Sequence, residues 1–345
     1  MQFKIVNTIH IPGLDFGASL LDDIDAELID HLCRTEAEII TQAADADAVI
    51  CSGPVQPWSS EVIQALTRCR IIASLGVGYD RIDMETANAR DIVVTNIPDY
   101  CIDEVASQTI ALALALSRKL FQVDRAVRSA EINFVPPKRQ GITGIIDPIF
   151  RTSEQTLGIV GFGKIGTATA LKAKGLGMQV IACDPYVYDA IMQSHGVKPV
   201  DFATLLQESD FVCINADLNP ETFQMFDQSA FVRMKPTAYL INTARGEIVD
   251  ETALVAALAE GQIAGAGLDV TVEDPVSLEN PLQQAPNVIL TGHSAWYSTT
   301  ADSSSEFWHK AMSQVVRALR GQWPQYAVNS EVKKRWLARW GQANR

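Results

Sequence analysis

The sequence predicts an α/β protein with two parallel-sheet domains, of which the second is inserted into the first. Its 345 residues exceed one ordinary core and suit two domains of roughly 100–200 residues each. Short β-rich runs alternate with helix-like stretches along the chain, and a second, complete alternation begins at Thr156. Such alternation is typical of parallel strands that are connected by crossover helices.

The first block has four predicted strands, at residues 3–7, 47–51, 70–74 and 92–95. Helix-like segments lie near residues 18–32, 35–44, 59–67 and 83–89. A long Ala- and Leu-rich helix is expected from about Asp103 to Arg128. A Pro- and Gly-containing surface loop is expected after it, from Val135 to Gly144.

The second block has six predicted strands: Leu157–Gly161, Gln179–Cys183, Phe211–Asn215, Ala238–Asn242, Gly265–Asp269 and Val288–Thr291. A last long helix is expected after His293, to about Leu319. The order of the blocks predicts a doubly wound domain at residues 103–295, inserted into a domain formed by residues 1–102 and 296–345.

Composition and charge narrow the class of protein. The formal net charge of −13 argues against a nucleic-acid partner, because phosphate binding needs clustered Lys and Arg. The richest apolar run, Thr109–Leu116, is shorter than the roughly 18 apolar residues of a membrane span. The N-terminus begins with the strand-like Phe3–Val6 rather than a secretory signal, so we expect a cytoplasmic protein with no membrane partner.

The six cysteines are scattered, without a CxxC pair or a His at metal-ligand spacing. We therefore expect no disulfide framework and no metal site, and we expect several of the cysteines to be small buried hydrophobes. The tail from Lys333 to Arg345 is basic and contains Trp336 and Trp340. A short amphipathic helix that docks on its own or a neighbouring subunit is expected there.

A glycine-rich turn begins the second block. The run Gly161-Phe162-Gly163-Lys164-Ile165-Gly166 matches GxGxxG, follows a predicted strand, and opens a helix that extends to about Gly175. In such a unit the first glycine permits the tight turn, the second lets backbone approach a pyrophosphate, and the third lets the helix pack on the strand. The helix N-terminus at Lys164 and Ile165 offers N–H groups to the phosphates.

Asp184 completes this unit, because it ends the next strand 18 residues after Gly166. A carboxylate there accepts hydrogen bonds from the adenosine ribose and repels a 2′-phosphate, which favours NAD over NADP. A plain turn ahead of Pro185 is the alternative. The complete strand–turn–helix–strand–acid context favours an NAD site.

Three charged residues follow strands of the second block, where active sites of such sheets form. Arg245 can bind a carboxylate with both nitrogens of its fork. His293 can act as an acid or base, and Glu273 can supply the carboxylate that keeps it protonated. Each residue taken alone is more often structural. Together they suit hydride chemistry on a hydroxy acid.

The order of these motifs resembles the D-isomer-specific 2-hydroxyacid dehydrogenase family over about residues 45–329. The matching motifs are residues 76–83 (GVGYDRID), 161–166, 219–222 (NPET), 242–246 (NTARG), 267–270 (GLDV) and 292–293 (GH). The resemblance implies two Rossmann-like or flavodoxin-like domains, NAD as the cofactor, and a small 2-oxo or 2-hydroxy acid as the substrate.

The same resemblance implies roles for single residues. Arg245 would bind the substrate carboxylate and carbonyl oxygen, and His293 would be the acid/base tuned by Glu273. Backbone amides of the loop Leu75-Gly76-Val77-Gly78 would hold the substrate carboxylate. The implied cofactor contacts, beside those of the glycine turn and Asp184, are Ala216, Thr243, Ala244, Asp269 and His293. Residues 215–217 (NAD) stand where the family commonly has His-x-Pro, so the cofactor contacts there are the least defined.

The run from His293 to Ser298 resembles the C-terminal-binding-protein branch of this family. Trp296 would then line the substrate pocket, or pack within the hinge helix. This branch also supplies a second hypothesis, an NAD(H)-sensing interaction protein, although the intact Arg245, Glu273 and His293 favour a dehydrogenase. A homodimer is expected from the family. The sequence leaves the physiological acid open among glyoxylate, hydroxypyruvate and larger apolar or sugar-derived 2-oxo acids.

Overall fold

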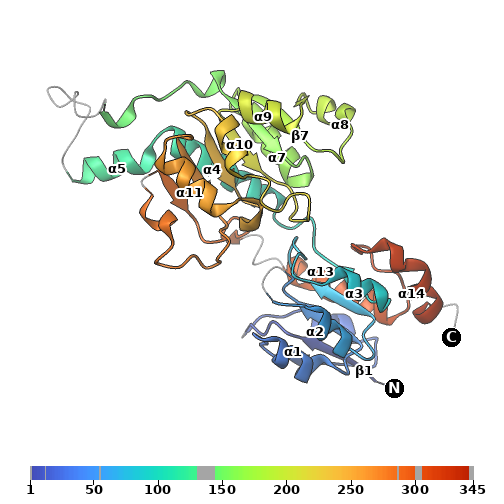
Figure 1. The fold of residues 1–345 in the computed structure, drawn as a ribbon. Coiled ribbons are helices and arrows are strands. Elements are labelled where there is room, and N and C mark those ends of the chain that lie inside the picture. The colour runs from blue at the N-terminus through green and yellow to red at the C-terminus, as the bar shows by residue number, and fades with distance from the viewer. Residues whose placement is uncertain are drawn as a thin grey trace. The chain divides into compact units, whose positions relative to one another are not determined.

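The computed structural model describes residues 2–11, 13–53, 56–129, 144–285, 287–299 and 305–341, and the chain divides into two compact units. Unit 1 comprises Met1–Tyr100 and Ser298–Arg345, and unit 2 comprises Cys101–Tyr297. Both are parallel-sheet α/β structures, so the predicted fold class is confirmed (Figure 1). The limits of the units lie within two residues of those expected from the sequence.

Unit 1 contains a five-stranded parallel sheet in the order β2-β1-β3-β4-β5. This is the order of flavodoxin-like doubly wound sheets. The strands are β1 (Phe3–Asn7), β2 (Ala26–Asp30), β3 (Ala48–Cys51), β4 (Ile71–Ser74) and β5 (Val93–Thr95).

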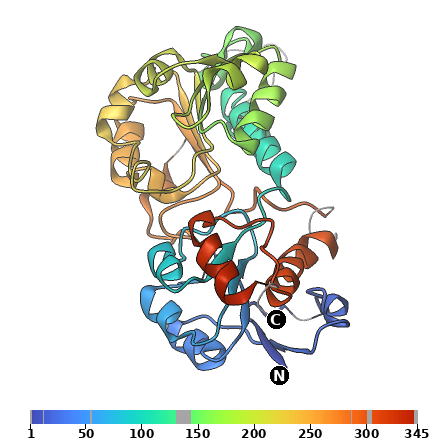
Figure 2. The ribbon, with the colours of Figure 1, turned by 90° about the vertical axis from the view of Figure 1, so that its right-hand side faces the viewer.

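Both faces of this sheet are covered, as the fully buried strands β3 and β4 require. One face packs against α1 (Glu36–Ala43), α2 (Ser60–Ala65) and α3 (Met84–Ala89), and the other packs against the short helix η1 (Ala18–Leu21) and against α13 (Ser305–Leu319) and α14 (Lys333–Trp340). Successive residues of a strand point to opposite faces of the sheet. Ile71 therefore packs on the face covered by α13, and Ile72 packs on the face covered by α1–α3. Figure 2 shows the C-terminal helices, in red, against this unit.

The helix predicted near residues 18–32 is wrong. The segment forms η1 and then the edge strand β2, which pairs with β1 only. β2 has the burial pattern of a half-exposed strand, and its alternation is too short to distinguish from one turn of an amphipathic helix. The parallel partner on β1, which lies far away in sequence, decides the conformation.

The basic tail forms the short helix α14, preceded by the 3-10 turn η5 (Ser330–Val332), and it docks on its own unit. Trp336 is fully buried, and its Nε1 donates to the carbonyl of Arg70 at 2.9 Å. The Arg70 guanidinium lies over the rings of Phe3 and Trp340, with centroid distances of 4.7 and 4.4 Å. The amphipathic docking helix predicted from the sequence is therefore present.

Unit 2 contains a seven-stranded parallel sheet in the order β12-β11-β10-β9-β6-β7-β8. The strands are β6 (Thr156–Val160), β7 (Gln179–Cys183), β8 (Lys198–Pro199), β9 (Phe211–Ile214), β10 (Tyr239–Asn242), β11 (Gly265–Leu268) and β12 (Val288–Leu290). The chain winds outward from β6 through β7 to β8, and from β9 through β10 and β11 to β12. The winding direction therefore changes between β6 and β9, which is where doubly wound sheets bind ligands.

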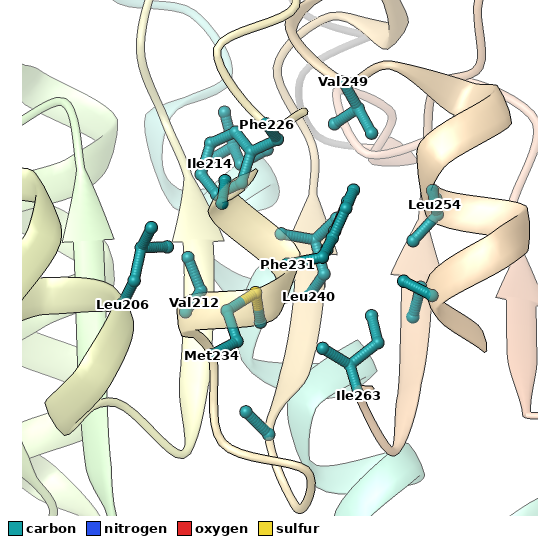
Figure 3. Close-up of a cluster of buried hydrophobic side chains, with 14 of the residues drawn as sticks. Leu206, Val212, Ile214, Phe226, Phe231, Met234, Leu240, Val249, Leu254 and Ile263 are labelled. Atoms are coloured by element: carbon teal, nitrogen blue, oxygen red, sulfur yellow. The ribbon is translucent and has the colours of Figure 1, made fainter. Parts of the chain in front are cut away.

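Helices cover both faces of the second sheet. One face packs on α4 (Ile102–Ser117), α7 (Lys164–Gly175) and α8 (Asp189–Ser194), and the other packs on α9 (Phe202–Glu208), α10 (Gln228–Arg233) and α11 (Glu251–Ala259). Figure 3 shows the second face, where Phe226 and Phe231 fill the space between the strands and these helices. Short 3-10 turns lie at Thr152–Glu154, Gly246–Ile248 and Pro281–Gln284.

The predicted long helix 103–128 is two helices, and this part of the prediction is corrected. α4 ends at Ser117, and α5 (Leu120–Arg128) begins after Lys119, whose φ of 52° is left-handed and cannot continue an α-helix. The surface loop predicted for 135–144 lies outside the described residues, apart from Gly144.

Five of the six cysteines are buried and all six are free. Burial raises the pKa of the Cys69 thiol to about 12 and raises those of Cys51 and Cys213 further. They behave as the small apolar side chains that the sequence predicts. In the described ranges, no helix is both long and apolar enough to cross a membrane.

Candidate active site

The carboxyl ends of the unit 2 strands carry most of the predicted site residues. Gly161 follows β6, Asp184 follows β7, and Ala216 lies just after β9. Arg245, Asp269 and His293 lie just after β10, β11 and β12. Because the sheet is parallel, all of these positions lie along one edge of it.

The close packing of the glycine turn explains why two of its positions are glycine. Gly161 has φ of +92°, and a Cβ there would lie 2.6 Å from the backbone nitrogen of Ala216, in the loop after the neighbouring strand β9. A Cβ at Gly166 would lie 2.2 Å from the carbonyl oxygen of Gly161. Packing therefore requires both of these glycines.

Packing within the protein does not require a glycine at position 163. A Cβ built there would meet no heavy atom within 4 Å, and Gly163 is the exposed N-cap of α7. The exposed Lys164 and the half-buried Ile165 follow it, in the helical turn whose N–H groups lack intrahelical partners. Open space in front of a glycine and a helix N-terminus fits a pyrophosphate, so the residues present suit a dinucleotide.

Asp184 organises the loops on both of its sides. Its Oδ2 accepts a hydrogen bond from the Phe162 N–H at 2.7 Å, and its Oδ1 accepts one from the Tyr186 N–H at 2.9 Å. A carboxylate has about four acceptor positions, so two remain for ribose hydroxyls. The geometry is compatible with the role in NAD binding that the sequence predicts.

Two other predicted cofactor residues follow β10. Thr243 is almost fully buried, and its hydroxyl shares a 2.9 Å hydrogen bond with that of Thr109 on α4. The Ala244 N–H donates to the side chain of Asn242, whose amide in turn donates to the Arg245 carbonyl. These bonds fix the backbone from which the Arg245 side chain leaves the sheet.

The Arg245 loop lies directly against the loop after β11. A Cβ at Gly246 would be 2.1 Å from the carbonyl carbon of Thr271, so only glycine permits this approach. The half-buried Arg245 donates from Nη1 to the Ala244 carbonyl at 2.7 Å. The backbone that follows Arg245 therefore lies beside the loop that carries Asp269 and Asp274.

Asp269 fixes the conformation of the His293 loop. Its carboxylate is buried and accepts hydrogen bonds from the Thr291 hydroxyl and from the N–H groups of Ser294 and Ala295, and its carbonyl accepts one from the His293 N–H at 2.5 Å. His293 has φ of 56°, a left-handed conformation that is uncommon for a residue with a side chain. The Asp269 bonds hold it there.

The ring of His293 contacts Asp274, and the predicted pairing with Glu273 is wrong. His293 Nδ1 lies 2.5 Å from Asp274 Oδ2, and about one third of each side chain is exposed. Glu273 instead accepts a hydrogen bond from the Ser277 N–H at 3.3 Å. Of the two adjacent acids, Asp274 contacts the histidine ring and Glu273 contacts the Ser277 N–H.

The sequence analysis therefore did not identify Asp274, the carboxylate that contacts the His293 ring. The available signal was the run of two acids before Pro275, which narrows the choice to two residues and does not decide between them. Trp296 lies three residues after His293, half-buried, with its ring edge-to-face with Tyr297 at a centroid distance of 5.6 Å.

The predicted substrate loop Leu75–Gly78 belongs to unit 1 and follows β4. Gly76 has φ of +107°, its carbonyl accepts from the Ile97 N–H at 2.8 Å, and the Val77 carbonyl accepts from the Asn96 side chain at 2.7 Å. The N–H groups of residues 76–78 donate to no acceptor within the described part of the chain. Backbone donors of this kind suit a carboxylate.

Comparison with known proteins identifies the family to which the chain belongs. The sequence model described as D-isomer specific 2-hydroxyacid dehydrogenase, NAD binding domain, matches residues 110–295. A glyoxylate reductase of Korarchaeum cryptofilum is 38% identical over 298 residues, which cover 86% of each chain. A glyoxylate reductase of Pyrococcus furiosus is 37% identical over 338 residues, which cover 97% of each.

Solved structures agree with the sequence comparisons. The NAD-complexed D-isomer specific 2-hydroxyacid dehydrogenase of Lactobacillus delbrueckii ssp. bulgaricus is 27% identical and covers 95% of this chain and 100% of its own, with a TM-score of 0.73. The predicted family and the predicted cofactor are both confirmed. The chain belongs to the D-isomer-specific 2-hydroxyacid dehydrogenase family and is an NAD-dependent oxidoreductase that acts on a CH–OH group.

Proposed function

We propose that this enzyme interconverts a small 2-oxo acid and its 2-hydroxy acid, with glyoxylate as the first substrate to test, and that Arg245, His293 and Asp274 are its catalytic residues. The observation that carries the proposal is the His293–Asp274 pair at the strand edge where Arg245 also lies. Glyoxylate is supported by the two relatives that are named glyoxylate reductase.

In this proposal the substrate carboxylate is bound by one cation, Arg245, and by backbone donors. The planar fork of Arg245 can bind the carboxylate and polarise the adjacent carbonyl oxygen. The N–H groups of residues 76–78 supply further donors to the carboxylate. Trp296 stays a predicted pocket wall, which a preference for bulky acids would support.

His293 moves the proton. Because Nδ1 faces Asp274, the other ring nitrogen, Nε2, is the atom left to exchange a proton with the substrate oxygen. During reduction Nε2 gives its proton to the oxygen that becomes the hydroxyl, and during oxidation it takes that proton back. Asp274 orients the ring and balances its positive charge when both nitrogens are protonated.

The cofactor is held at the glycine turn in this proposal. Gly163, Lys164 and Ile165 bind the pyrophosphate, and Asp184 binds the adenosine ribose. Ala216, Thr243 and Ala244 contact the part of the cofactor that runs along the strand edge, and Asp269 contacts the nicotinamide carboxamide. NAD supplies the hydride acceptor or donor when it is bound.

The test is NADH consumption with glyoxylate, hydroxypyruvate, pyruvate, a bulky apolar 2-oxo acid and a phosphorylated one. We expect turnover of the small acids, and we expect D-lactate from pyruvate. His293→Gln should lower kcat/KM by at least about 100-fold. His10→Asn, at an exposed histidine of unit 1, is the matched control and should change nothing. An enzyme that binds NADH and reduces none of these acids would contradict the proposal.

A further inference from the structure

A side-chain hydrogen bond connects two loops beside the glycine turn. The Tyr186 hydroxyl donates to the Glu221 carboxylate. Tyr186 lies in the loop after β7, two residues beyond Asp184, and Glu221 lies in the loop between β9 and α10. β7 and β9 are the two neighbours of β6 in the sheet, so the bond joins the loops on either side of the strand that leads into the glycine turn.

Both ends of this bond are anchored by backbone. The Tyr186 N–H donates to Asp184 Oδ1, which fixes the start of the side chain. On the other loop, the Glu221 N–H donates to Asn219 Oδ1 at 2.8 Å, and the Thr222 hydroxyl donates to the Asp217 carbonyl at 2.6 Å. The glycine turn, Asp184, Tyr186 and Glu221 therefore form one continuous hydrogen-bonded series.

Two carboxylates act on the same phenol. The hydrogen bond to Glu221 raises the pKa of Tyr186, and the negative charges of Glu221 and Asp184 raise it further. The Tyr186 hydroxyl therefore binds the Glu221 carboxylate at the loop that also carries Asp184. The Tyr186 hydrogen bond thus brings a second carboxylate, from the loop after β9, to the loop after β7.

We propose that Tyr186 and Glu221 form a second coenzyme-selecting element, in which Tyr186 holds the Glu221 carboxylate at the adenosine end and thereby disfavours a 2′-phosphate. The inference rests on the proposed placement of the adenosine ribose at Asp184. Asp184 selects both by hydrogen bonds to the ribose hydroxyls and by its charge. Glu221 selects by charge alone, so its removal affects NADPH more than NADH.

The size of the effect follows from exposure. Tyr186 and Glu221 are both exposed, so the repulsion acts through water and is screened by salt. A phosphate of nearly two negative charges within about one Debye length should lose roughly threefold to tenfold in affinity to one carboxylate. The loss should be largest at low ionic strength.

The experiment measures dissociation constants of NADH and NADPH by calorimetry for the full-length enzyme and its variants. Glu221→Gln should tighten NADPH binding by about threefold to tenfold relative to NADH. Tyr186→Phe, which releases Glu221, should move the ratio in the same direction by a smaller factor. Glu260→Gln is the matched control, because Glu260 is also exposed and also accepts a side-chain hydrogen bond, but it precedes β11, which is next to the opposite edge strand β12.

An unchanged ratio of NADPH to NADH affinity in Glu221→Gln would overturn the inference. Ultraviolet titration of the phenols without nucleotide gives an independent readout, since Glu221→Gln should lower the pKa of one tyrosine. The absence of that shift would show that the pair does not form, and would also overturn it. Gly163→Val tests the placement of the cofactor separately, because it should weaken both nucleotides alike.

Discussion

His293 is held twice, by its backbone on Asp269 and by its ring on Asp274. The first contact fixes the backbone of His293, from which the side chain extends. The second contact occupies Nδ1 and leaves Nε2 for the substrate. Both partners come from the loop after β11, so a single loop sets the position and the orientation of the proposed acid/base.

Replacing the two adjacent acids separately tests this arrangement. Asp274→Asn should lower kcat/KM by about 10- to 100-fold, because the ring loses its charged partner while its position on Asp269 stays the same. Glu273→Gln should stay within about twofold, because this side chain contacts the Ser277 N–H and not the ring. Steady-state kinetics of both variants with the best 2-oxo acid is the measurement. Equal losses in the two would contradict the assignment.

For single residues, the sequence could predict which strand ends carry charged side chains. It could not predict which of two neighbouring side chains contacts a given partner. Arg245 and His293 stand alone after their strands, so their places at the sheet edge follow from the fold. Glu273 and Asp274 are adjacent acids, and the sequence does not show which of them contacts the ring. The Tyr186–Glu221 bond joins loops 35 residues apart, and no local pattern announces it.

At the level of secondary-structure elements, the turn between β6 and α7 contains three glycines with different roles. Gly161 and Gly166 are required by the protein's own backbone, whereas Gly163 faces open space. The structure thus separates the glycines that fold the turn from the one that would meet a ligand.

Two alanine variants should separate these roles. Gly161→Ala should cost about 2 kcal/mol or more in stability, because φ of +92° disfavours a side chain and the new Cβ would overlap the Ala216 backbone. Gly163→Ala should leave the melting temperature within about 2 °C and weaken NADH binding by about tenfold or more, since its methyl group enters the space proposed for the pyrophosphate. Thermal unfolding and calorimetry measure both. A Gly163→Ala enzyme with unchanged NADH affinity would contradict the placement.

Helix α14 should contribute strongly to the stability of unit 1. Trp336→Ala removes a fully buried ring and its hydrogen bond to Arg70, for which we expect a loss of about 3–5 kcal/mol. Lys334→Ala changes an exposed residue of the same helix and should cost less than about 0.5 kcal/mol. Urea unfolding followed by circular dichroism compares them. Coincident transitions for the two variants would show that the docking of α14 contributes little.

The strands of both sheet cores could be predicted from the sequence, because parallel strands covered on both faces are nearly continuous apolar runs. The edge strands β2 and β8 could not. β8 has only two residues, and β2 is half-exposed, so the conformation of each depends on its pairing with the neighbouring strand. The break between α4 and α5 depends on one backbone angle at Lys119, which composition does not encode.

For the whole molecule, the order of the motifs was enough to predict that one unit interrupts the other. The glycine turn, Arg245 and His293 all fall between Cys101 and Tyr297, and the chain returns to unit 1 only after them. The expected homodimer, the cytoplasmic location and the resemblance to the C-terminal-binding-protein branch stay predictions.

NADH binding should stabilise unit 2 in particular. At 100 times its dissociation constant, a ligand that binds only the folded state adds about 2.7 kcal/mol. Hydrogen exchange should then slow in residues 161–166, 184–186 and 215–217, and should not change in α1 of unit 1. Mass spectrometry of peptides with and without NADH locates the effect. Protection confined to unit 1 would contradict the assignment of the cofactor to unit 2.

The left-handed backbone of His293 has a consequence for how the protein can change under selection. Asparagine and glycine adopt this conformation more easily than histidine, so the proposed acid/base occupies a position that is better suited to other residues. A variant library screened only for resistance to heat should therefore accumulate Asn or Gly at position 293. The selected variants would be more stable to heat and would have lost turnover. Stability and catalysis therefore favour different residues at position 293.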